Sequence, residues 1–279
     1  MKINIVCAGN KNFIVPLKVM IKSLTINTKE NLNVFILNKD WEDEDKIDFI
    51  ETFSSTKHME IKFLDVENYE CLESFKTTQN IPIEAYFRLF LPEILPDNIE
   101  QIIYLDGDII VEGDIKELWE IPIREKALMA VPEMFHEAHY VSSPLALHTF
   151  KKLNIPEKQK YFNSGVLKIN IKKWKADKIV SRIINYLIEN KDEVLWHDQD
   201  GLNAILWNDW EELPSEWNVM TALFQENDFS RIGISDEVAH HIMKNPKIIH
   251  YTNSKEKPWK ETCTNPLKDK YFFYSSMIN

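Results

Sequence analysis

The stretch Tyr104-Leu105-Asp106-Gly107-Asp108-Ile109-Ile110-Val111 places two carboxylates inside an apolar run. Such a run is typical of a buried strand, where an unpaired charge is costly to desolvate. Side chains two residues apart in an extended chain point the same way, so Asp106 and Asp108 could converge on one cation. Gly107 lets the backbone turn and a ligand approach closely. A strand followed by a plain Asp-Gly turn explains the same residues equally well, and the rest of the chain has to decide.

Composition places the chain among globular proteins. Of its 279 residues, 44% are hydrophobic and 28% are charged, which suits one large or two small domains. The formal net charge of -11 argues against general nucleic-acid binding, because no excess of Lys and Arg is available to neutralise phosphates. We therefore expect no nucleic-acid partner.

Three widely spaced cysteines, Cys7, Cys71 and Cys263, indicate a reducing compartment, since they offer neither a disulfide framework nor a zinc site. Residues 2–7 begin a strand with no apolar signal-peptide region, and no run approaches the length of a membrane span. We expect a cytoplasmic protein with at most peripheral membrane association, which leaves attachment to the inner face of the membrane open. The basic, aromatic tail around 268–274 fits a packed C-terminus, which we favour, or a weak membrane-surface patch.

Strand and helix patterns alternate along the first half of the chain. Strands are expected at 2–7, 34–37 and 60–66. Amphipathic helices are expected around 17–24 and at 41–53, the second with Ile47, Ile50 and Phe53 on its apolar face. This alternation predicts a parallel α/β sheet with right-handed crossovers.

The second half is less regular. Helices are expected at 85–95, 172–190 and 198–206, and further strands at 101–105, 127–131, 164–171 and 246–251. The helix at 172–190 would bury Trp174, Ile179, Ile183 and Leu187. The irregular stretch 137–159 is long for a loop in a compact chain, which favours a substrate loop or a lid.

Several common nucleotide and nucleophile motifs are missing from the sequence. No Gly-x-Gly-x-x-Gly follows the first strand, and there is neither a phosphate-loop Gly-Lys-Ser/Thr nor a Gly-x-Ser-x-Gly elbow. A sheet that binds a nucleotide without such loops needs another way to hold the diphosphate. A divalent cation held by carboxylates is the simplest candidate.

The Asp106-Gly107-Asp108 triplet resembles the Asp-x-Asp motif of nucleotide-sugar glycosyltransferases with the GT-A fold, and further ordered blocks resemble glycosyltransferase family 8 in particular. This retaining family includes bacterial lipopolysaccharide galactosyl- and glucosyltransferases. The blocks are Ile5-Val6-Cys7-Ala8-Gly9-Asn10, Tyr86-Phe87-Arg88-Leu89, Tyr161-Phe162-Asn163-Ser164-Gly165-Val166-Leu167 with Asn170-Ile171-Lys172-Lys173-Trp174, His197-Asp198-Gln199-Asp200-Gly201-Leu202-Asn203, and His250-Tyr251 with Lys257-Pro258-Trp259.

The resemblance implies one GT-A domain over 1–279, with a Rossmann-like, mainly parallel central sheet flanked by helices. A nucleotide-binding half would cover about 1–112, and an acceptor- and sugar-binding half about 113–279. The implied reaction moves a hexose with retention from UDP-glucose or UDP-galactose to a saccharide or glycan acceptor, in cell-envelope polysaccharide or glycoprotein glycan synthesis. The implied metal is Mn²⁺, with Mg²⁺ as the second choice.

The same resemblance assigns the metal and diphosphate contacts. Asp106, Asp108 and His250 would bind the metal, and the imidazole favours Mn²⁺ over Mg²⁺. Lys257 would lie on the diphosphate as a point charge. Without the other blocks, we would rate His250 as a core histidine and Lys257 as a solvated surface lysine.

At the nucleotide end, Ala8 and Asn10 match family positions that contact the uracil and the ribose, and Gly107 lies between the two metal-binding carboxylates. Arg88, beside Tyr86 on a helix, would reach the diphosphate or the sugar. A structural salt bridge is the alternative for Arg88.

At the sugar end, Asn163 and Gln199 would border the transferred hexose, with Asp198 beside them and Glu133 on a sugar hydroxyl. Asp198 is the carboxylate we can nominate for a covalent glycosyl intermediate. The matching family position near the anomeric carbon is Gln199, a poor nucleophile. We therefore favour attack from the leaving-group face, with charge stabilised by the metal, Lys257 and Arg88.

Two other functions remain open at this point. A sugar-nucleotide nucleotidyltransferase also uses carboxylates on a similar sheet, but it should carry a Gly-rich Lys/Arg signature after the first strand, and Ala8-Gly9-Asn10-Lys11 is a poor match. A saccharide-binding or assembly protein of the same fold would have lost turnover. The intact Asp106, Asp108, His250 and Lys257 argue against that alternative.

Overall fold

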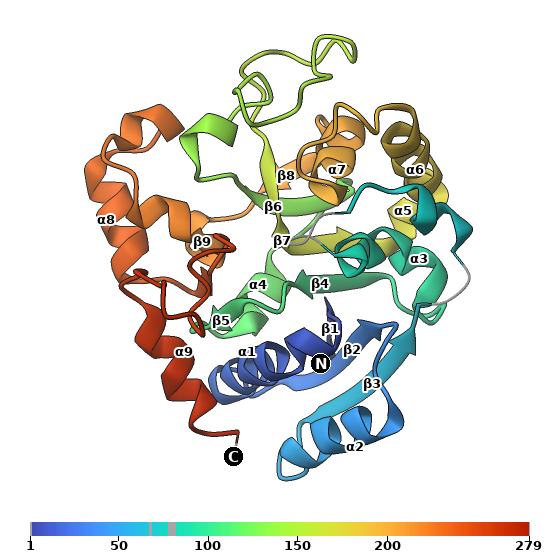
Figure 1. Ribbon diagram of the computed structural model, residues 1–279, viewed down its shortest axis with the longest axis vertical. Helices are drawn as coiled ribbons and strands as arrows, with labels where there is room; N and C mark the ends of the chain where they lie inside the picture. Colours follow the sequence, from blue (N-terminus) through green and yellow to red (C-terminus); the bar gives the residue numbers. More distant parts are fainter. Residues whose placement is uncertain (1, 67–68, 78–81, 279) are drawn as a thin grey trace.

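The structure, a computed structural model, describes residues 2–66, 69–77 and 82–278. Within this part of the chain, seven strands form a central sheet in the order β3-β2-β1-β4-β7-β6-β8, which rises from β3 to β8 in Figure 1. The strands are β1 (Lys2–Ala8), β2 (Asn31–Asn38), β3 (Met59–Asp65), β4 (Gln101–Leu105), β6 (Leu128–Pro132), β7 (Phe162–Asn170) and β8 (Trp210–Glu212).

The sheet is mainly parallel, as predicted. Strands β3, β2, β1 and β4 are parallel neighbours, and β6 is parallel to β8. Strand β7 runs antiparallel between β4 and β6. Leu105 at the end of β4 therefore pairs with Val166 in the middle of β7, and the Asp106 N–H donates to the Gly165 carbonyl at 2.8 Å. This inverted strand brings residues 163–165 next to Asp106.

Helices cover both faces of the sheet. They are α1 (Ile14–Asn27), α2 (Asp43–Thr52), α3 (Leu91–Ile94), α4 (Ile115–Glu120), α5 (Ile171–Ala176), α6 (Ile179–Glu189), α7 (Asp198–Leu206), α8 (Asp236–Lys244) and α9 (Lys268–Ser275). Side chains of β4 alternate between two buried cores: Tyr104 packs with the α5–α7 side, and Ile103 packs with the α1 and α2 side. None of the helices in the described residues is long and apolar enough to cross a membrane.

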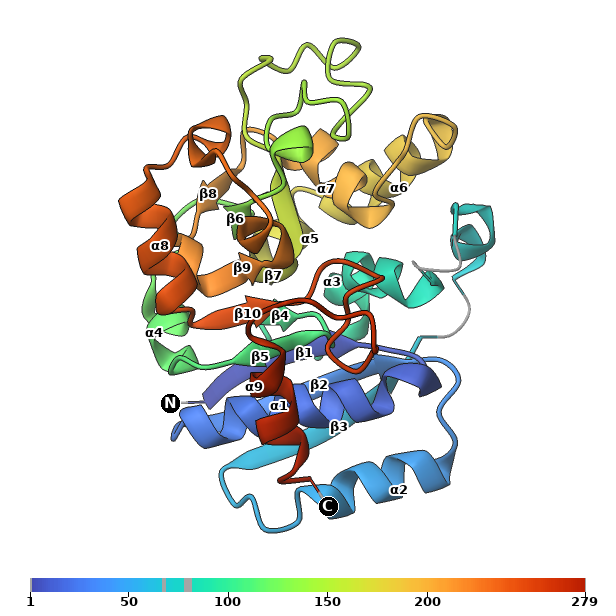
Figure 2. The same cartoon turned by 60° about the vertical axis from the view of Figure 1, so that its left-hand side comes forward.

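A second, three-stranded sheet joins the middle of the chain to its last strand. It consists of β5 (Ile109–Val111), β10 (Ile248–His250) and β9 (Val219–Met220), in that order. His250 pairs with Ile109, and the Tyr251 N–H donates to the Asp108 carbonyl at 3.1 Å. Figure 2 shows β10 lying beside β5, with α9 crossing over α1. The pairing sets His250 directly beside the Asp pair.

The helix predicted at 41–53 exists, but its buried face was assigned wrongly. Helix α2 spans Asp43–Thr52 and buries Phe49. Ile47 is 55% exposed and Ile50 is 48% exposed, although Phe53 is buried as expected. The Phe49 ring packs against Trp41, with ring centroids 5.3 Å apart. The packing of Phe49 against Trp41, which lies outside the helix, therefore decides which side of α2 is buried. The spacing of the aliphatic residues does not.

The single helix predicted at 172–190 is two helices, α5 and α6. Lys178, between them, has φ 51°, a left-handed backbone that cannot continue a helix. The buried residues were predicted correctly, since Trp174, Ile179, Ile183 and Leu187 are all buried. The break lets α5 and α6 both turn an apolar side inward while the chain changes direction.

The helix predicted at 85–95 begins earlier and has a different type. A 3₁₀-helix covers Ile83–Phe90, and only Leu91–Ile94 is an α-helix. A 3₁₀-helix repeats every three residues, so Ala85 and Arg88 lie on one side of it. Both residues line the pocket described below.

Trp174 offers a direct test of the core on the α5–α7 side. Its side chain is fully buried, and its Nε1–H donates to the Ala127 carbonyl at 3.0 Å. Trp174→Ala is expected to lower the free energy of unfolding by about 3–5 kcal/mol. Trp174→Phe keeps most of the volume but loses the hydrogen bond, so we expect a loss of about 1–2 kcal/mol. Urea denaturation measures both, and equal losses would contradict a packing role.

Candidate active site

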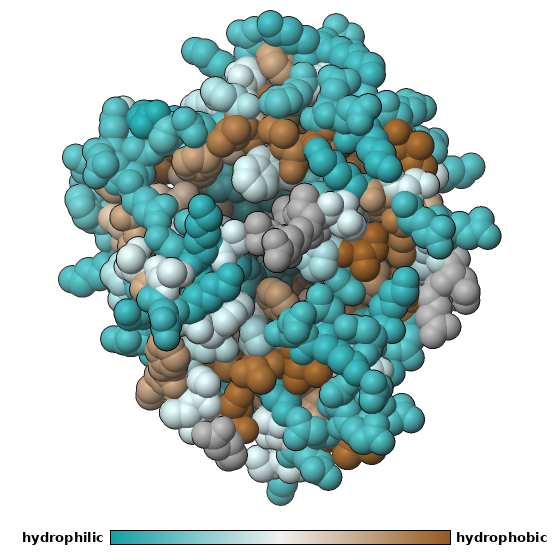
Figure 3. Space-filling view, in the orientation of Figure 1, coloured by the Kyte–Doolittle hydropathy of each residue, from teal (hydrophilic) through white to brown (hydrophobic). Residues whose placement is uncertain are grey.

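A cavity of about 720 Å³ opens where β1 and β4 end, and residues from both halves of the chain line it. The face shown in Figure 3 is hollowed near its centre. The predicted site residues in its wall are Ala8, Asn10, Arg88, Asp106, Gly107, Asp108, Glu133, Asn163, Asp198, Gln199, His250 and Lys257. Tyr86 lies outside this wall: it is buried, and its hydroxyl donates to the Lys76 carbonyl at 2.6 Å.

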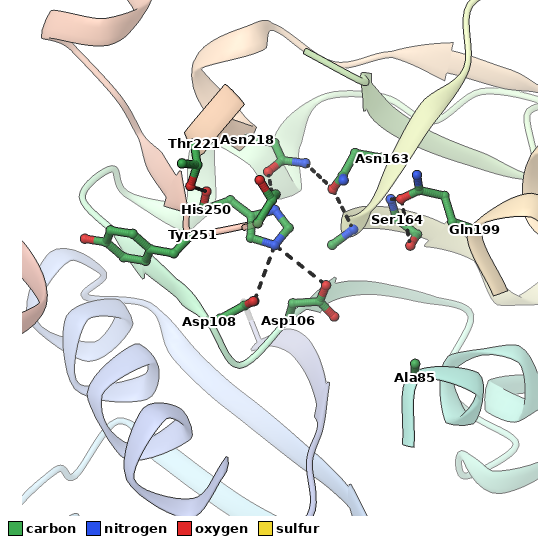
Figure 4. A network of polar contacts seen from close by, with 12 residues as sticks. Ala85, Asp106, Asp108, Asn163, Ser164, Gln199, Asn218, Thr221, His250 and Tyr251 are labelled. Atoms are coloured by element: carbon green, nitrogen blue, oxygen red, sulfur yellow. Dashed lines mark hydrogen bonds and ion pairs between the residues drawn. The ribbon is translucent and has the colours of Figure 1, made fainter. Parts of the chain in front are cut away.

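Asp106, Asp108 and His250 form a group with the geometry of a metal site. Each offers one ligand atom, and these atoms lie within 4.8 Å of one another. His250 Nε2 lies 3.3 Å from Asp108 Oδ1 and 3.8 Å from Asp106 Oδ2, as Figure 4 shows. The three residues are brought together by the end of β4, the turn after it and the end of β10.

The prediction that the Asp pair lies in extended chain was wrong. Strand β4 ends at Leu105, and Gly107 and Asp108 form a turn before β5. The turn is needed because β4 belongs to the seven-stranded sheet, whereas β5 belongs to the three-stranded one. The carboxylates therefore converge through a change of direction, so the Asp-Gly turn and the convergence of the two carboxylates, first weighed as alternatives, occur together.

The residues around this group fit a bound cation. Gly165 packs so tightly against it that a Cβ atom there would lie 2.2 Å from His250 Cε1 and 2.8 Å from Asp106 Oδ2. Two carboxylates and one imidazole are donors that Mn²⁺ and related divalent ions accept. A side chain at position 165 would collide with His250 and Asp106, so the glycine there lets these donors face one another.

Positive side chains balance the two carboxylates. The Lys257 ammonium pairs with Asp108 and donates to the Tyr251 carbonyl at 2.5 Å. Burial raises the pKa of the Asp108 carboxyl, but Lys257 and His250 outweigh burial and hold that pKa well below its usual range. Asp108 is thus an anion at any pH at which the protein would work.

Arg88 connects Asp106 to Asp198. Its Nη2 donates to Asp106 Oδ1 at 2.8 Å, and its Nε lies 3.1 Å from Asp198 Oδ2. The guanidinium also donates to the Ser164 carbonyl and lies 4.3 Å from the centre of the Tyr104 ring. All of these contacts are with groups of the protein, which supports the alternative that Arg88 forms a structural salt bridge.

Asp198 and Gln199 begin helix α7 at the far side of the pocket. Burial, opposed by the Arg88 guanidinium, raises the pKa of Asp198 to about 6. Gln199 Oε1 accepts from the Ser164 N–H at 2.8 Å and lies 3.2 Å from the Ser164 hydroxyl. His197, just before them, has φ 56°, a strained conformation for a residue with a Cβ. Such strain is typical of functional sites.

Glu133 and Asn163 are in contact, as their shared predicted role at the sugar implies. Asn163 Nδ2 donates to Glu133 Oε2 at 3.0 Å. Asn163 Oδ1 accepts from Asn218, a fully buried residue that also contacts His250. The sequence analysis missed Asn218 and Ser164. Ser164 belongs to one of the sequence blocks that resemble the family, whereas Asn218 belongs to no motif. Only the fold brings Asn218 next to His250.

At the opposite end, Ala8 is the last residue of β1 and Asn10 follows the strand. Asn10 Oδ1 caps the next turn by accepting from the Asn12 N–H at 3.1 Å, and its Nδ2 lies 3.5 Å from Glu84 Oε2. Burial raises the pKa of the Glu84 carboxyl. Glu84 lines the same part of the pocket, and sequence reasoning did not select it.

The stretch 137–159 is irregular, as predicted, with a single 3₁₀ turn at His136–Ala138 beside it. His136 Nδ1 lies 2.6 Å from Glu226 Oε2, and His139 Nδ1 lies 2.5 Å from the Glu133 carbonyl. Burial lowers the pKa of His139, which keeps it neutral. Both histidines therefore have partners within the protein.

Comparison with known proteins identifies the family. Residues 4–263 match Glycosyl transferase family 8. General stress protein A of Bacillus subtilis is 32% identical over 219 residues, which cover 77% of this chain and 72% of that protein. The lipopolysaccharide 1,2-glucosyltransferase of Escherichia coli K12 is 24% identical, over 96% of this chain and 76% of its own.

The fold is also that of a solved glycosyltransferase. The crystal structure of the galactosyltransferase LgtC, in complex with donor and acceptor sugar analogs, matches with a TM-score of 0.81 and 23% identity, over 98% of this chain and 95% of that one. That likeness establishes the GT-A fold. Together with the family match over residues 4–263, it shows that the chain is a glycosyltransferase and belongs to glycosyl transferase family 8.

Proposed function

We propose that this glycosyltransferase moves a hexose, glucose or galactose, from a UDP-sugar to a saccharide or glycan acceptor with retention, using a divalent cation. The observation that carries the proposal is the group formed by Asp106, Asp108 and His250, whose ligand atoms lie within 4.8 Å of one another. Asn163 and Gln199 line the same pocket. The product would enter cell-envelope polysaccharide or glycoprotein glycan.

Asp106, Asp108 and His250 would hold the cation. Three protein ligands leave room in an octahedral shell for two diphosphate oxygens, and the imidazole favours Mn²⁺ over Mg²⁺. Bound there, the ion would neutralise charge that develops on the departing diphosphate.

Two cationic side chains of the protein support the same end of the reaction. Lys257, whose ammonium already lies at Asp108, would place its charge on the diphosphate. Arg88 would act by holding Asp106 and Asp198 in position, because its guanidinium is directed at both carboxylates. Ala8 and Asn10 would shape the nucleotide end, whereas Tyr86, outside the pocket wall, would support the 3₁₀-helix that carries Arg88.

Retention follows most simply from attack on the leaving-group face. Asp198 is buried and ion-paired with Arg88, which makes it a poor nucleophile, and the Gln199 amide is a poorer one. In front-face attack the bond to the acceptor oxygen forms as the bond to the diphosphate breaks, and a diphosphate oxygen takes the acceptor's proton. Glu133 and Asn163 would orient the hexose hydroxyls.

We further propose that residues 1–279 act as one domain and that the enzyme works in the cytoplasm, with at most peripheral membrane association. Tyr271 and Tyr274 of α9 pack inward, which supports the favoured reading of the tail. Phe272 and Phe273 are 50% and 53% exposed. Aromatic side chains on a helix with lysines suit weak contact with an anionic lipid surface.

Slow UDP release from a panel of UDP-sugars tests the reaction. We expect release from one UDP-hexose with Mn²⁺, less with Mg²⁺ and none with chelator. Asp108→Asn should lower turnover at least about 100-fold, because a charged ligand of the cation is lost. Asp97→Asn, at a side chain that is 104% exposed, is the matched control. Release that ignores both chelator and Asp108→Asn would contradict metal-dependent transfer. The anomeric proton of the product, observed by NMR, reports retention.

Gly165→Ala tests the proposed cation site, because Gly165 packs against His250 and Asp106. The added methyl group would lie 2.2 Å from His250 Cε1, so we expect His250 to move and Mn²⁺ affinity to fall at least about tenfold. Gly201→Ala is the control, because a Cβ there would also be crowded, 2.8 Å from Ile183 Cγ2, but within the α6–α7 contact. Titration calorimetry with Mn²⁺ measures both. An unchanged affinity for Gly165→Ala would count against this site.

Asp198 predicts a pH dependence. Burial raises the pKa of its carboxyl to about 6, so Asp198 is protonated below that pH and ionised above it. Protonation removes the anionic partner of Arg88, and we expect kcat/KM at saturating Mn²⁺ to fall as pH drops through about 6. Asp198→Asn should be slower throughout and lack this inflection. The same inflection in Asp198→Asn would assign it to another group.

A further inference from the structure

One backbone N–H sets the orientation of a chain of buried side chains that ends at His250 (Figure 4). The Gly165 N–H donates to Asn163 Oδ1 at 3.0 Å. A backbone N–H can only donate, so the atom of Asn163 that faces it must be the oxygen. The orientation of this amide is therefore fixed by chemistry and not by a choice between two similar fits.

A second contact of Asn163 confirms its orientation. With the oxygen toward Gly165, the Asn163 amino group donates to Glu133 Oε2 at 3.0 Å. The other oxygen of this carboxylate accepts from the N–H groups of Met134 at 3.0 Å and Phe135 at 3.2 Å. A reversed Asn163 would set oxygen against carboxylate and N–H against N–H.

The orientation passes from Asn163 through Asn218 to His250. Because Asn163 Oδ1 is an acceptor, Asn218 must present its amino group there, at 3.0 Å. The Asn218 oxygen then faces His250 Nδ1 at 2.9 Å, so Nδ1 carries the proton. Nε2 is the nitrogen that faces Asp106 and Asp108, and in the neutral ring it keeps its lone pair.

We propose that Asn218 is a positioning residue that holds His250 in the tautomer able to bind a metal and, through Asn163, joins the cation site to Glu133 at the sugar end. The inference rests on the proposed use of a divalent cation. Asn218 is fully buried and ends a 3₁₀ turn, Ser215–Asn218, just before β9. It acts only through its neighbours, as a partner of a metal-binding histidine commonly does.

Two variants separate the contact of Asn218 with His250 from its contact with Asn163. Asn218→Leu removes both the acceptor for His250 and the donor to Asn163. Asn218→Asp keeps an oxygen for His250 Nδ1 but cannot donate to Asn163. Asn190→Leu is the control, since Asn190 is also buried, at 5% exposure, and ends helix α6 through a bond to the Tyr186 carbonyl at 2.8 Å. It loses a buried amide far from the cation site in the sequence and in the fold.

The tautomer of His250 is the readout that a merely structural role would not change. Long-range ¹H–¹⁵N spectra of histidine-labelled, metal-free protein at about pH 9, where imidazoles are neutral, distinguish Nδ1–H from Nε2–H, and His250→Gln assigns the signal. Wild type and Asn218→Asp should show Nδ1–H, and Asn218→Leu should show a mixture or Nε2–H. Asn190→Leu should match the wild type.

Mn²⁺ affinity and kinetics complete the test. The EPR signal of the free ion, with and without UDP, should report an affinity about 10–100-fold lower in Asn218→Leu. Asn218→Asp should retain the affinity and lower kcat, because the hydrogen bond that links Asn163 to Asn218 is lost while the contact with His250 remains. A wild-type tautomer and affinity in Asn218→Leu would overturn the proposal, as would equal losses in Asn190→Leu. If the wild type binds Mn²⁺ no better than the double variant Asp106→Asn/Asp108→Asn, the proposed function is contradicted. The tautomer spectra still test the hydrogen-bond network in that case, because they are recorded without metal.

Discussion

Two carboxylates and one imidazole, held within 4.8 Å of one another among buried strands, are the constraint on which the rest of the site depends. Charges in such surroundings need partners, because both carboxylates are mostly buried. Arg88 supplies one cation, at Asp106, and Lys257 supplies the other, at Asp108. These partners come from points before and far after the Asp pair in the sequence. The charge balance of the site therefore requires the whole fold.

The fold meets this requirement with two departures from a simple parallel sheet. Strand β7 is inserted antiparallel beside β4, which delivers Asn163, Ser164 and Gly165 to Asp106. The small sheet pairs β10 with β5, which delivers His250 to Asp108. Each departure places one side of the site, and the turn at Gly107 links the two sheets. A purely parallel sheet would have left the Asp pair without these neighbours.

The strand pattern and the ordered blocks predicted the mainly parallel sheet, the family and the residues that gather in the pocket. Local pattern failed where distant residues decide. Phe49, not Ile47 or Ile50, is buried in α2 because Trp41 lies over it. Lys178 breaks a helix whose apolar spacing runs on without interruption. Asn218 could not be found from sequence, since one asparagine has no spacing to detect and its partners are set by tertiary structure alone.

The Lys257–Asp108 ion pair has a thermodynamic consequence. A free cation that enters the site must compete with an ammonium group that already occupies one of its ligands. A diphosphate relieves this competition, because it offers Lys257 other anionic oxygens. On the proposed function, the donor and the metal therefore bind with positive linkage, and by reciprocity each raises the affinity for the other. On that proposal the lysine would act as an internal counter-ion, which weakens metal binding in the empty enzyme and moves to the diphosphate when the donor binds.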